Sequence, residues 1–192
     1  GKTWSPASPA FRFTSADSPM RVKPAGGRAV AVFNPQAFSC LYTAGEIWKS
    51  PKRTPLVCAV SRDGGASFGE FRTDDFLIEE KAIGCNASFL RVERKDLPDD
   101  AQALLPDDAD SVTVFVNPRS DRRNTMTACV SFDSGATWSH TKLIWKTACA
   151  YTSLDFSRHD GRFFLLYERG EDDPYGHGIA MKEFDLQWLL SK

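Results

Sequence analysis

SFDSGATW at residues 131–138 repeats the pattern of SRDGGASF at residues 61–68, and each stretch follows a run of apolar or β-branched residues. An Asp at the third position can accept hydrogen bonds from backbone amides of its own turn, and a Gly at the fifth position supplies a positive φ. The aromatic residue at the eighth position can pack the turn against the core. Each stretch is therefore predicted to be the turn of a β-hairpin. The repeated positions are Ser61, Asp63, Gly65 and Phe68, and Ser131, Asp133, Gly135 and Trp138.

Alternating strand patterns surround both turns and group into units at residues 19–73, 86–146 and 150–190. Repeated four-stranded antiparallel units are typical of the blades of a β-propeller, which closes with ~4 to 8 blades. The sequence thus predicts an all-β fold, a partial β-propeller, as a single segment over residues 1–192. A two-sheet sandwich is the structural alternative. Apart from a short helical end at EFDLQWLL, helical signals are poor.

The first four residues, GKTW, match the end of the repeated phrase, so residues 1–18 are expected to finish a preceding blade. An incomplete ring would expose strand edges and blade faces, which favours association with other chain. We therefore expect either a missing amino-terminal half of the propeller or self-association.

Composition limits the partners. The chain has 24 Lys and Arg against 25 Asp and Glu, so no whole-molecule field would attract nucleic acid or an anionic membrane. No apolar run approaches the ~18 residues that span a bilayer. We expect neither nucleic acid nor a membrane as a partner.

The cysteines are odd in number and scattered, without a CxxC pair, which argues against a disulfide framework and a zinc site. This pattern favours a reducing, cytoplasmic compartment, and a secreted protein stays open. The histidines lie far apart, and the acidic stretch at residues 98–110 lacks calcium-loop spacing, so it is predicted to be a solvated loop. We expect no metal and no cofactor. The cysteines are Cys40, Cys58, Cys85, Cys129 and Cys149, of which Cys58 and Cys129 are predicted to be buried.

The repeated phrase S-x-D-x-G-x-[TS]-[WF] resembles the Asp box, or BNR repeat, of the sialidase (neuraminidase) superfamily. The likeness continues along the chain, through an arginine before NTMTACVSFD, a Tyr in CAYTSL, the strand LYERG and a final EFDLQWL. This order is similar to the carboxy-terminal part of an exo-sialidase. The resemblance implies that the chain forms about half of a six-bladed sialidase-like propeller.

The resemblance also implies roles for three residues. Tyr151 matches the nucleophile, and a neutral phenol suits this role because sialic acid carries a carboxylate on the anomeric carbon. Arg123 matches one of three arginines that clamp that carboxylate. Glu168 matches a glutamate that orients another clamp arginine. The structural alternatives are a core tyrosine, a solvated loop arginine, and a glutamate paired with Arg169 or Arg162.

Two positions depart from the family pattern. Ser18 stands where a glutamate would activate the nucleophile, and Asn34 stands where a second clamp arginine would end the same hairpin. A Ser cannot take the phenolic proton at neutral pH, and an Asn cannot neutralise a carboxylate. Arg53 is the best substitute for the missing arginine.

The leading hypothesis is a sialidase-like glycoside hydrolase that acts on terminal acidic sugars of a glycan and retains the anomeric configuration. The alternatives are a non-catalytic carbohydrate-binding or scaffold propeller, and a hydrolase or lyase that acts on a different sugar.

Overall fold

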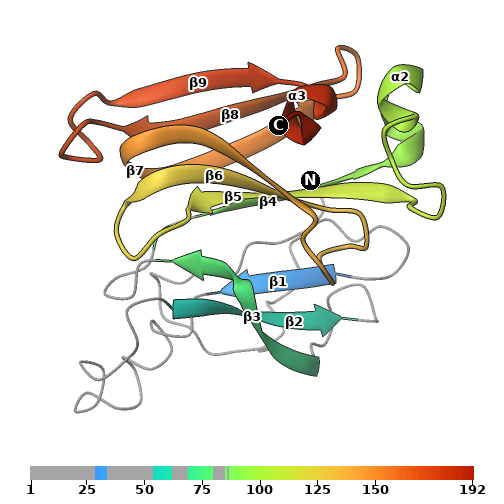
Figure 1. Ribbon diagram of the computed structural model, residues 1–192, viewed down its shortest axis with the longest axis horizontal. Coiled ribbons are helices and arrows are strands. Elements are labelled where there is room, and N and C mark those ends of the chain that lie inside the picture. Colours follow the sequence, from blue (N-terminus) through green and yellow to red (C-terminus); the bar gives the residue numbers. More distant parts are fainter. Residues whose placement is uncertain (1–28, 34–53, 62–68, 80–84, 86) are drawn as a thin grey trace, which may run out of the picture.

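The computed structural model describes residues 29–33, 54–61, 69–79, 85 and 87–192 of the 192-residue chain. These residues form two antiparallel sheets, shown in Figure 1. The smaller sheet has the order β1-β2-β3, with strands Ala29–Phe33, Thr54–Ser61 and Gly69–Glu79. The larger sheet has the order β4-β5-β6-β7-β8-β9, with strands Ser88–Glu93, Ser111–Pro118, Asn124–Ser131, His140–Ser157, Arg162–Arg169 and Ile179–Phe184.

Strand β7 joins two halves of the larger sheet. Residues 140–148 pair with β6, whereas residues 149–157 pair with β8. The strand is continuous over 18 residues and is strongly curved in Figure 1. The change of partner falls between Ala148 and Cys149. The blade limits of 19–73, 86–146 and 150–190 stay a prediction.

The main core lies on one face of the larger sheet. Alternate residues of a strand point to opposite faces, and the inward positions of β5, β6 and β8 are apolar. The short helix α3, Leu186–Leu190, closes this core with two buried leucines. Fully buried members are Val112, Val114, Val116, Met126, Ala128, Val130, Phe163 and Leu165.

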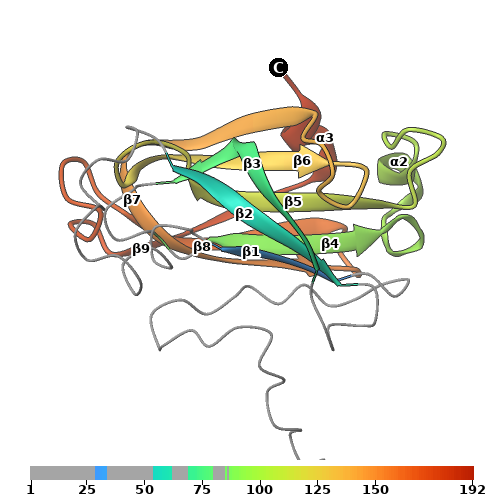
Figure 2. The same cartoon turned by 90° about the horizontal axis from the view of Figure 1, so that it is seen from below.

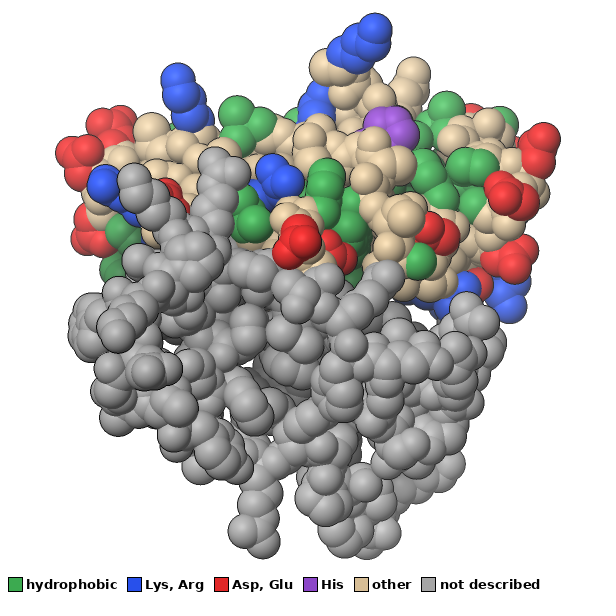
Figure 3. Space-filling model, turned by 60° about the horizontal axis from the view of Figure 1, so that its bottom comes forward, with side chains coloured by type: hydrophobic (Ala, Val, Ile, Leu, Met, Phe, Trp, Pro, Cys, Tyr) green, Lys and Arg blue, Asp and Glu red, His purple; other side chains and the backbone are tan. Residues whose placement is uncertain are grey.

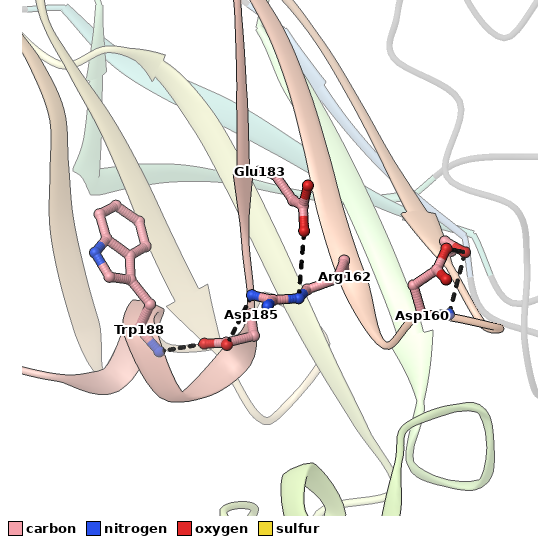
Figure 4. Close-up of polar contacts among 6 residues, drawn as sticks. Asp160, Arg162, Glu183, Asp185 and Trp188 are labelled. Atoms are coloured by element: carbon pink, nitrogen blue, oxygen red, sulfur yellow. Dashed lines mark hydrogen bonds and ion pairs between the residues drawn. The ribbon is translucent and has the colours of Figure 1, made fainter.

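Helix α3 is held by a polar cluster (Figure 4). The Asp185 carboxylate accepts a hydrogen bond from the Trp188 amide at 2.7 Å, which caps the helix amino terminus. Arg162 pairs with Asp185 at 3.0 Å and with Glu183 at 3.4 Å. On the adjacent turn, Ser157 Oγ donates to Asp160 at 2.6 Å. The short helical end expected in EFDLQWLL is therefore confirmed.

The acidic stretch at residues 98–110 differs from its prediction as a solvated loop. It contains helix α2, Asp99–Gln102, after the 3-10 turn η2, Arg94–Asp96. Three of its apolar residues, spaced four positions apart, are buried, whereas Ala103, Leu104 and the acidic residues are exposed. Arg94 fastens the stretch by donating to the carbonyl oxygens of Ala109, Gln102 and Pro106. The buried residues are Ala101, Leu105 and Ala109.

The turn at residues 131–138 connects β6 to β7 and is closed by its own side chains. Asp133 Oδ1 accepts from the Thr137 amide at 2.8 Å and from Ser131 Oγ at 2.7 Å, and Ser131 Oγ accepts from the Gly135 amide at 2.8 Å. Gly135 has a φ of +82°, in the left-handed region that favours glycine. Trp138 packs its ring against Phe89 and Phe115.

The two sheets meet through this turn and through the carboxyl end of β5. Trp138 Nε1 donates to Asp74 of β3 at 2.9 Å. Asn117 of β5 donates to the carbonyl oxygen of Ile78 at 2.9 Å, and Arg119 donates to that of Phe76 at 2.9 Å. The views of Figures 1 and 2 show the smaller sheet lying against the larger one.

The first copy of the turn, with Asp63, Gly65 and Phe68, lies outside the described residues, and Ser61 is described only as the last residue of β2. Cys129 is buried as expected, and so is Cys149; burial raises the pKa of each thiol to about 12, so both are protonated at neutral pH. Among the described residues, no helix is long and apolar enough to cross a membrane.

Candidate functional site

An arginine and two tyrosines meet at the end of the larger sheet where β8 ends and β9 begins, on the left of Figure 1. Arg123 directly precedes β6, and Tyr151 lies in β7. Tyr175 lies in the loop of residues 170–178 between β8 and β9. Glu168, near the end of β8, adjoins them through Tyr151. We call these four residues the Arg–Tyr cluster.

The Arg123 guanidinium is the centre of the Arg–Tyr cluster. Its carbon lies 5.2 Å from the centre of the Tyr151 ring and 6.0 Å from that of Tyr175, distances at which a cation is attracted to an aromatic face. Its Nη1 donates a hydrogen bond to the Tyr175 hydroxyl. The Tyr151 and Tyr175 side chains are 44% and 51% exposed, so both rings are within reach of a ligand in solvent.

The surroundings of Arg123 keep its guanidinium charged. Burial lowers the pKa of Arg123, but Cys85 and the hydroxyls of Tyr151 and Tyr175 outweigh this effect and leave the pKa above its ordinary value. Burial raises the pKa of Tyr175, which the positive charge of Arg123 only partly opposes. At neutral pH the guanidinium is therefore charged and the Tyr175 phenol is neutral, an arrangement suited to a small anion.

Glu168 contacts the backbone of Tyr151. Its Oε2 accepts a hydrogen bond from the Tyr151 amide at 3.1 Å. Of the two alternative partners expected from the sequence, Arg162 pairs with Glu183 and Asp185, and Arg169 stacks on Trp145 at 4.7 Å. The hydrogen bond from the Tyr151 amide to Glu168 thus ties β7 to β8 locally, while the expected role of Glu168 towards another clamp arginine stays a prediction.

The backbone beside Arg123 is unusual. Thr125 has a φ of +61°, a strained conformation for a β-branched residue, at a bulge where the register of β6 against β7 shifts. Such strain costs about 1–3 kcal/mol and is concentrated at functional sites. The Arg123 carbonyl accepts from the Cys149 amide at 2.8 Å, which ties the start of β6 to β7 close to Tyr151.

Arg122 and Arg123 both precede β6, and Arg122 lies in a turn closed by Ser120, whose hydroxyl accepts from the Arg122 amide at 3.0 Å. The Arg122 side chain is exposed. Arg123, in contrast, lies over the Tyr151 ring.

Sequence reasoning missed Tyr175. A weak signal was present, because the loop DDPYGHG places an Asp two residues before the Tyr and glycines after it, a pattern typical of a tight turn. In the structure the Asp173 carboxylate accepts from the Tyr175 amide at 3.1 Å, and the Asp173 carbonyl accepts from the Gly176 amide at 3.0 Å. The turn directs the ring towards Arg123, which no local pattern could predict.

Several predicted positions lie outside the described residues. They include Arg53, the candidate substitute clamp residue, and the departures at Ser18 and Asn34. Over the part of the chain that is described, no three His, Cys, Asp or Glu side chains are grouped so as to hold a metal ion. The face in Figure 3 carries acidic, basic and hydrophobic side chains interspersed over the described residues.

No family model and no curated protein matches the sequence. The fold, however, matches solved sialidase structures. The chain is similar to the NanB sialidase from Streptococcus pneumoniae (14% identity, TM-score 0.64), covering 92% of this chain and 24% of that one. It is also similar to the Hadza microbial sialidase Hz136, with 17% identity and a TM-score of 0.63, covering 91% of this chain and 29% of that one. The intramolecular trans-sialidase from Ruminococcus gnavus is similar as well, with 13% identity and a TM-score of 0.61, covering 93% of this chain and 34% of that one.

At these identities the similarity establishes the fold. The chain has a sialidase-like fold, and the prediction of an all-β partial β-propeller is confirmed. The two-sheet sandwich is not supported. The chain spans about a quarter to a third of the length of these sialidases.

Proposed function

We propose that this chain supplies part of the active site of a sialidase-like glycoside hydrolase that removes a terminal acidic sugar from a glycan. The observation that carries the proposal is the contact of Arg123 with Tyr151, two residues 28 positions apart whose roles the sequence resemblance had assigned to one pocket. A guanidinium fork can bind the planar carboxylate of such a sugar, and an exposed phenol beside it can reach the anomeric carbon.

In the proposed reaction a general base takes the Tyr151 hydroxyl proton while the phenolic oxygen attacks the anomeric carbon and forms a glycosyl–tyrosine bond. The bond to the leaving-group oxygen breaks, and that oxygen takes a proton from a general acid. Water then attacks the same carbon, releases the sugar and returns the phenol. Two displacements retain the anomeric configuration. We propose that the general acid and the base that activates Tyr151 are supplied by residues outside the Arg–Tyr cluster.

The other members of the cluster act on position and charge. Arg123 would bind the sugar carboxylate, and its charge would offset the negative charge of the substrate. Glu168 would hold the nucleophile by its contact with the Tyr151 amide. We propose Arg53 as a second carboxylate contact, in place of the arginine that Asn34 replaces.

The direct test is hydrolysis of the fluorogenic 4-methylumbelliferyl α-ketoside of N-acetylneuraminic acid by the full-length protein. Tyr151→Phe should lower kcat by at least about 100-fold, because the oxygen that forms the covalent bond is lost. Tyr167→Phe is the matched control, since Tyr167 is a buried tyrosine of the neighbouring strand β8. Equal rates in Tyr151→Phe and wild type would remove the proposal.

A second candidate is a propeller that binds acidic sugars without cleaving them. The observation that favours it is the pair of departures at Ser18 and Asn34, which removes the usual base and one clamp arginine. In that case the full-length protein should bind a sialoside with no turnover, and Tyr151→Phe should bind as tightly as wild type. Turnover of a different acidic or neutral sugar in a panel of fluorogenic glycosides would instead support the third hypothesis from the sequence.

A further inference from the structure

The loop at residues 170–178 is built to present one side chain. Besides the Asp173 contacts, the Tyr175 carbonyl accepts from the Gly178 amide at 3.2 Å, and the Arg169 carbonyl accepts from the His177 amide at 3.0 Å. A Cβ on Gly170 would lie 1.6 Å from the Asp173 carbonyl oxygen, so the loop requires glycine there. Tyr175 therefore sits on a closed turn that is anchored to the end of β8.

The Tyr175 ring reaches across the sheet end to Arg123, from a position 52 residues away in the sequence. Its hydroxyl accepts a hydrogen bond from Arg123 Nη1, and its ring lies 6.0 Å from the guanidinium carbon. The Tyr151 ring contacts the same guanidinium at 5.2 Å. One hydrogen bond and two ring contacts together restrict the rotamer of an otherwise flexible side chain.

We propose that Tyr175 is a positioning residue that holds the Arg123 guanidinium in the orientation needed to bind the carboxylate of an acidic sugar. This inference rests on the proposed function. A planar guanidinium binds a carboxylate through two parallel N–H groups only when its plane is correctly set. A neutral phenol can set that plane without cancelling the positive charge, which a carboxylate partner would do.

The test compares a sugar that carries the free carboxylate with the same sugar in which that group is a methyl ester. Binding of the methyl α-glycoside of N-acetylneuraminic acid and of its C1 methyl ester to the full-length protein is measured by titration calorimetry. Tyr175→Phe, which keeps the ring and removes the hydroxyl, should weaken binding of the acid about tenfold and leave the ester unchanged. In hydrolysis of the fluorogenic sialoside, the same variant should raise KM by a similar factor with kcat nearly constant.

Matched variants distinguish positioning from loop folding. His177→Ala removes an exposed side chain from the same loop and keeps the backbone amide that bonds the Arg169 carbonyl, so it should bind both ligands as wild type does. In an Arg123→Ala background, Tyr175→Phe should have no further effect on acid binding, because the group that it positions is gone.

Two failures can be told apart. If the wild type binds acid and ester equally, the proposed acidic-sugar function is overturned. If the wild type prefers the acid and Tyr175→Phe keeps that preference unchanged, the proposed function stands and the positioning role of Tyr175 is overturned. A loss of binding to both ligands in Tyr175→Phe would likewise overturn selective positioning of Arg123.

Discussion

The turn at residues 131–138 and the Arg–Tyr cluster are opposite kinds of structure in one molecule. The turn is closed by hydrogen bonds among Ser131, Asp133, Gly135 and Thr137, all within seven consecutive residues. The cluster is assembled from four segments, and its Arg123–Tyr175 contact spans 52 residues. The turn is anchored in the core, whereas the two tyrosines of the cluster are exposed. This difference fits a turn that stabilises the fold and a cluster with the ligand-binding role proposed above.

The largest effect should come from the anchor of the turn. Trp138→Ala should lower the free energy of unfolding by about 3–5 kcal/mol, because it removes ring contacts with Phe89 and Phe115 and the hydrogen bond to Asp74. Urea unfolding of the full-length protein measures this loss. Trp138→Phe, which keeps a ring, should cost less. A change below about 1 kcal/mol in Trp138→Ala would show that the turn does not anchor the fold.

Removal of the turn's carboxylate should have the next largest effect. Asp133→Ala breaks hydrogen bonds with Ser131 Oγ, the Thr137 amide and Thr137 Oγ1, and should cost about 1–3 kcal/mol of unfolding free energy. Asp133→Asn should cost less, since it keeps one acceptor oxygen. Equal stability in wild type and Asp133→Ala would mean that these contacts are replaced by water at no cost.

The lowered pKa of the Asp133 carboxylate predicts that the protein loses stability at acidic pH. Burial alone would raise the pKa of Asp133, but hydrogen bonds from Thr137, Ser131 and the Ala136 amide outweigh it and hold the pKa below its ordinary value. A lowered folded-state pKa contributes stability above the unfolded pKa, near 4, and that stability is lost as the pH falls through the folded value. Urea unfolding between pH 7 and pH 3 should therefore show a shallower loss in Asp133→Asn than in wild type. Parallel curves would contradict the role of this group.

Gly135→Ala tests backbone conformation alone. An added Cβ would meet Phe89 at 3.6 Å and Trp138 at 3.7 Å, which are ordinary contacts, so space is not limiting. The cost comes from the φ of +82° and should be about 1 kcal/mol in urea unfolding. Gly135→Asn should cost less, because Asn tolerates the left-handed region better than Ala does. If the two variants were equally stable, backbone strain would not be the cause.

The sequence predicted the first kind of structure better than the second. Phrases such as SFDSGATW carry their own closing groups, so the 131–138 hairpin could be read locally. The stretch at residues 98–110 was predicted to be a loop from its acidic charges. The prediction did not take into account the four-residue spacing of Ala101, Leu105 and Ala109, which are buried. Tyr175 could not be placed, since its approach to Arg123 depends on the paths of both β7 and β8. Contacts of long sequence separation carry no local signature.

The smallest expected effect on stability lies in the Arg–Tyr cluster, and it decides whether the two regions differ in kind. Tyr151→Phe removes one hydroxyl from a ring that is 44% exposed, so urea unfolding should change by less than about 0.5 kcal/mol. The same change should abolish most hydrolysis under the proposed function. A loss of stability as large as that of Gly135→Ala would make Tyr151 a structural residue, and the cluster would then resemble the turn. Unchanged stability combined with lost turnover would separate the two regions: the turn stabilises the fold, and the Tyr151 hydroxyl acts in the reaction.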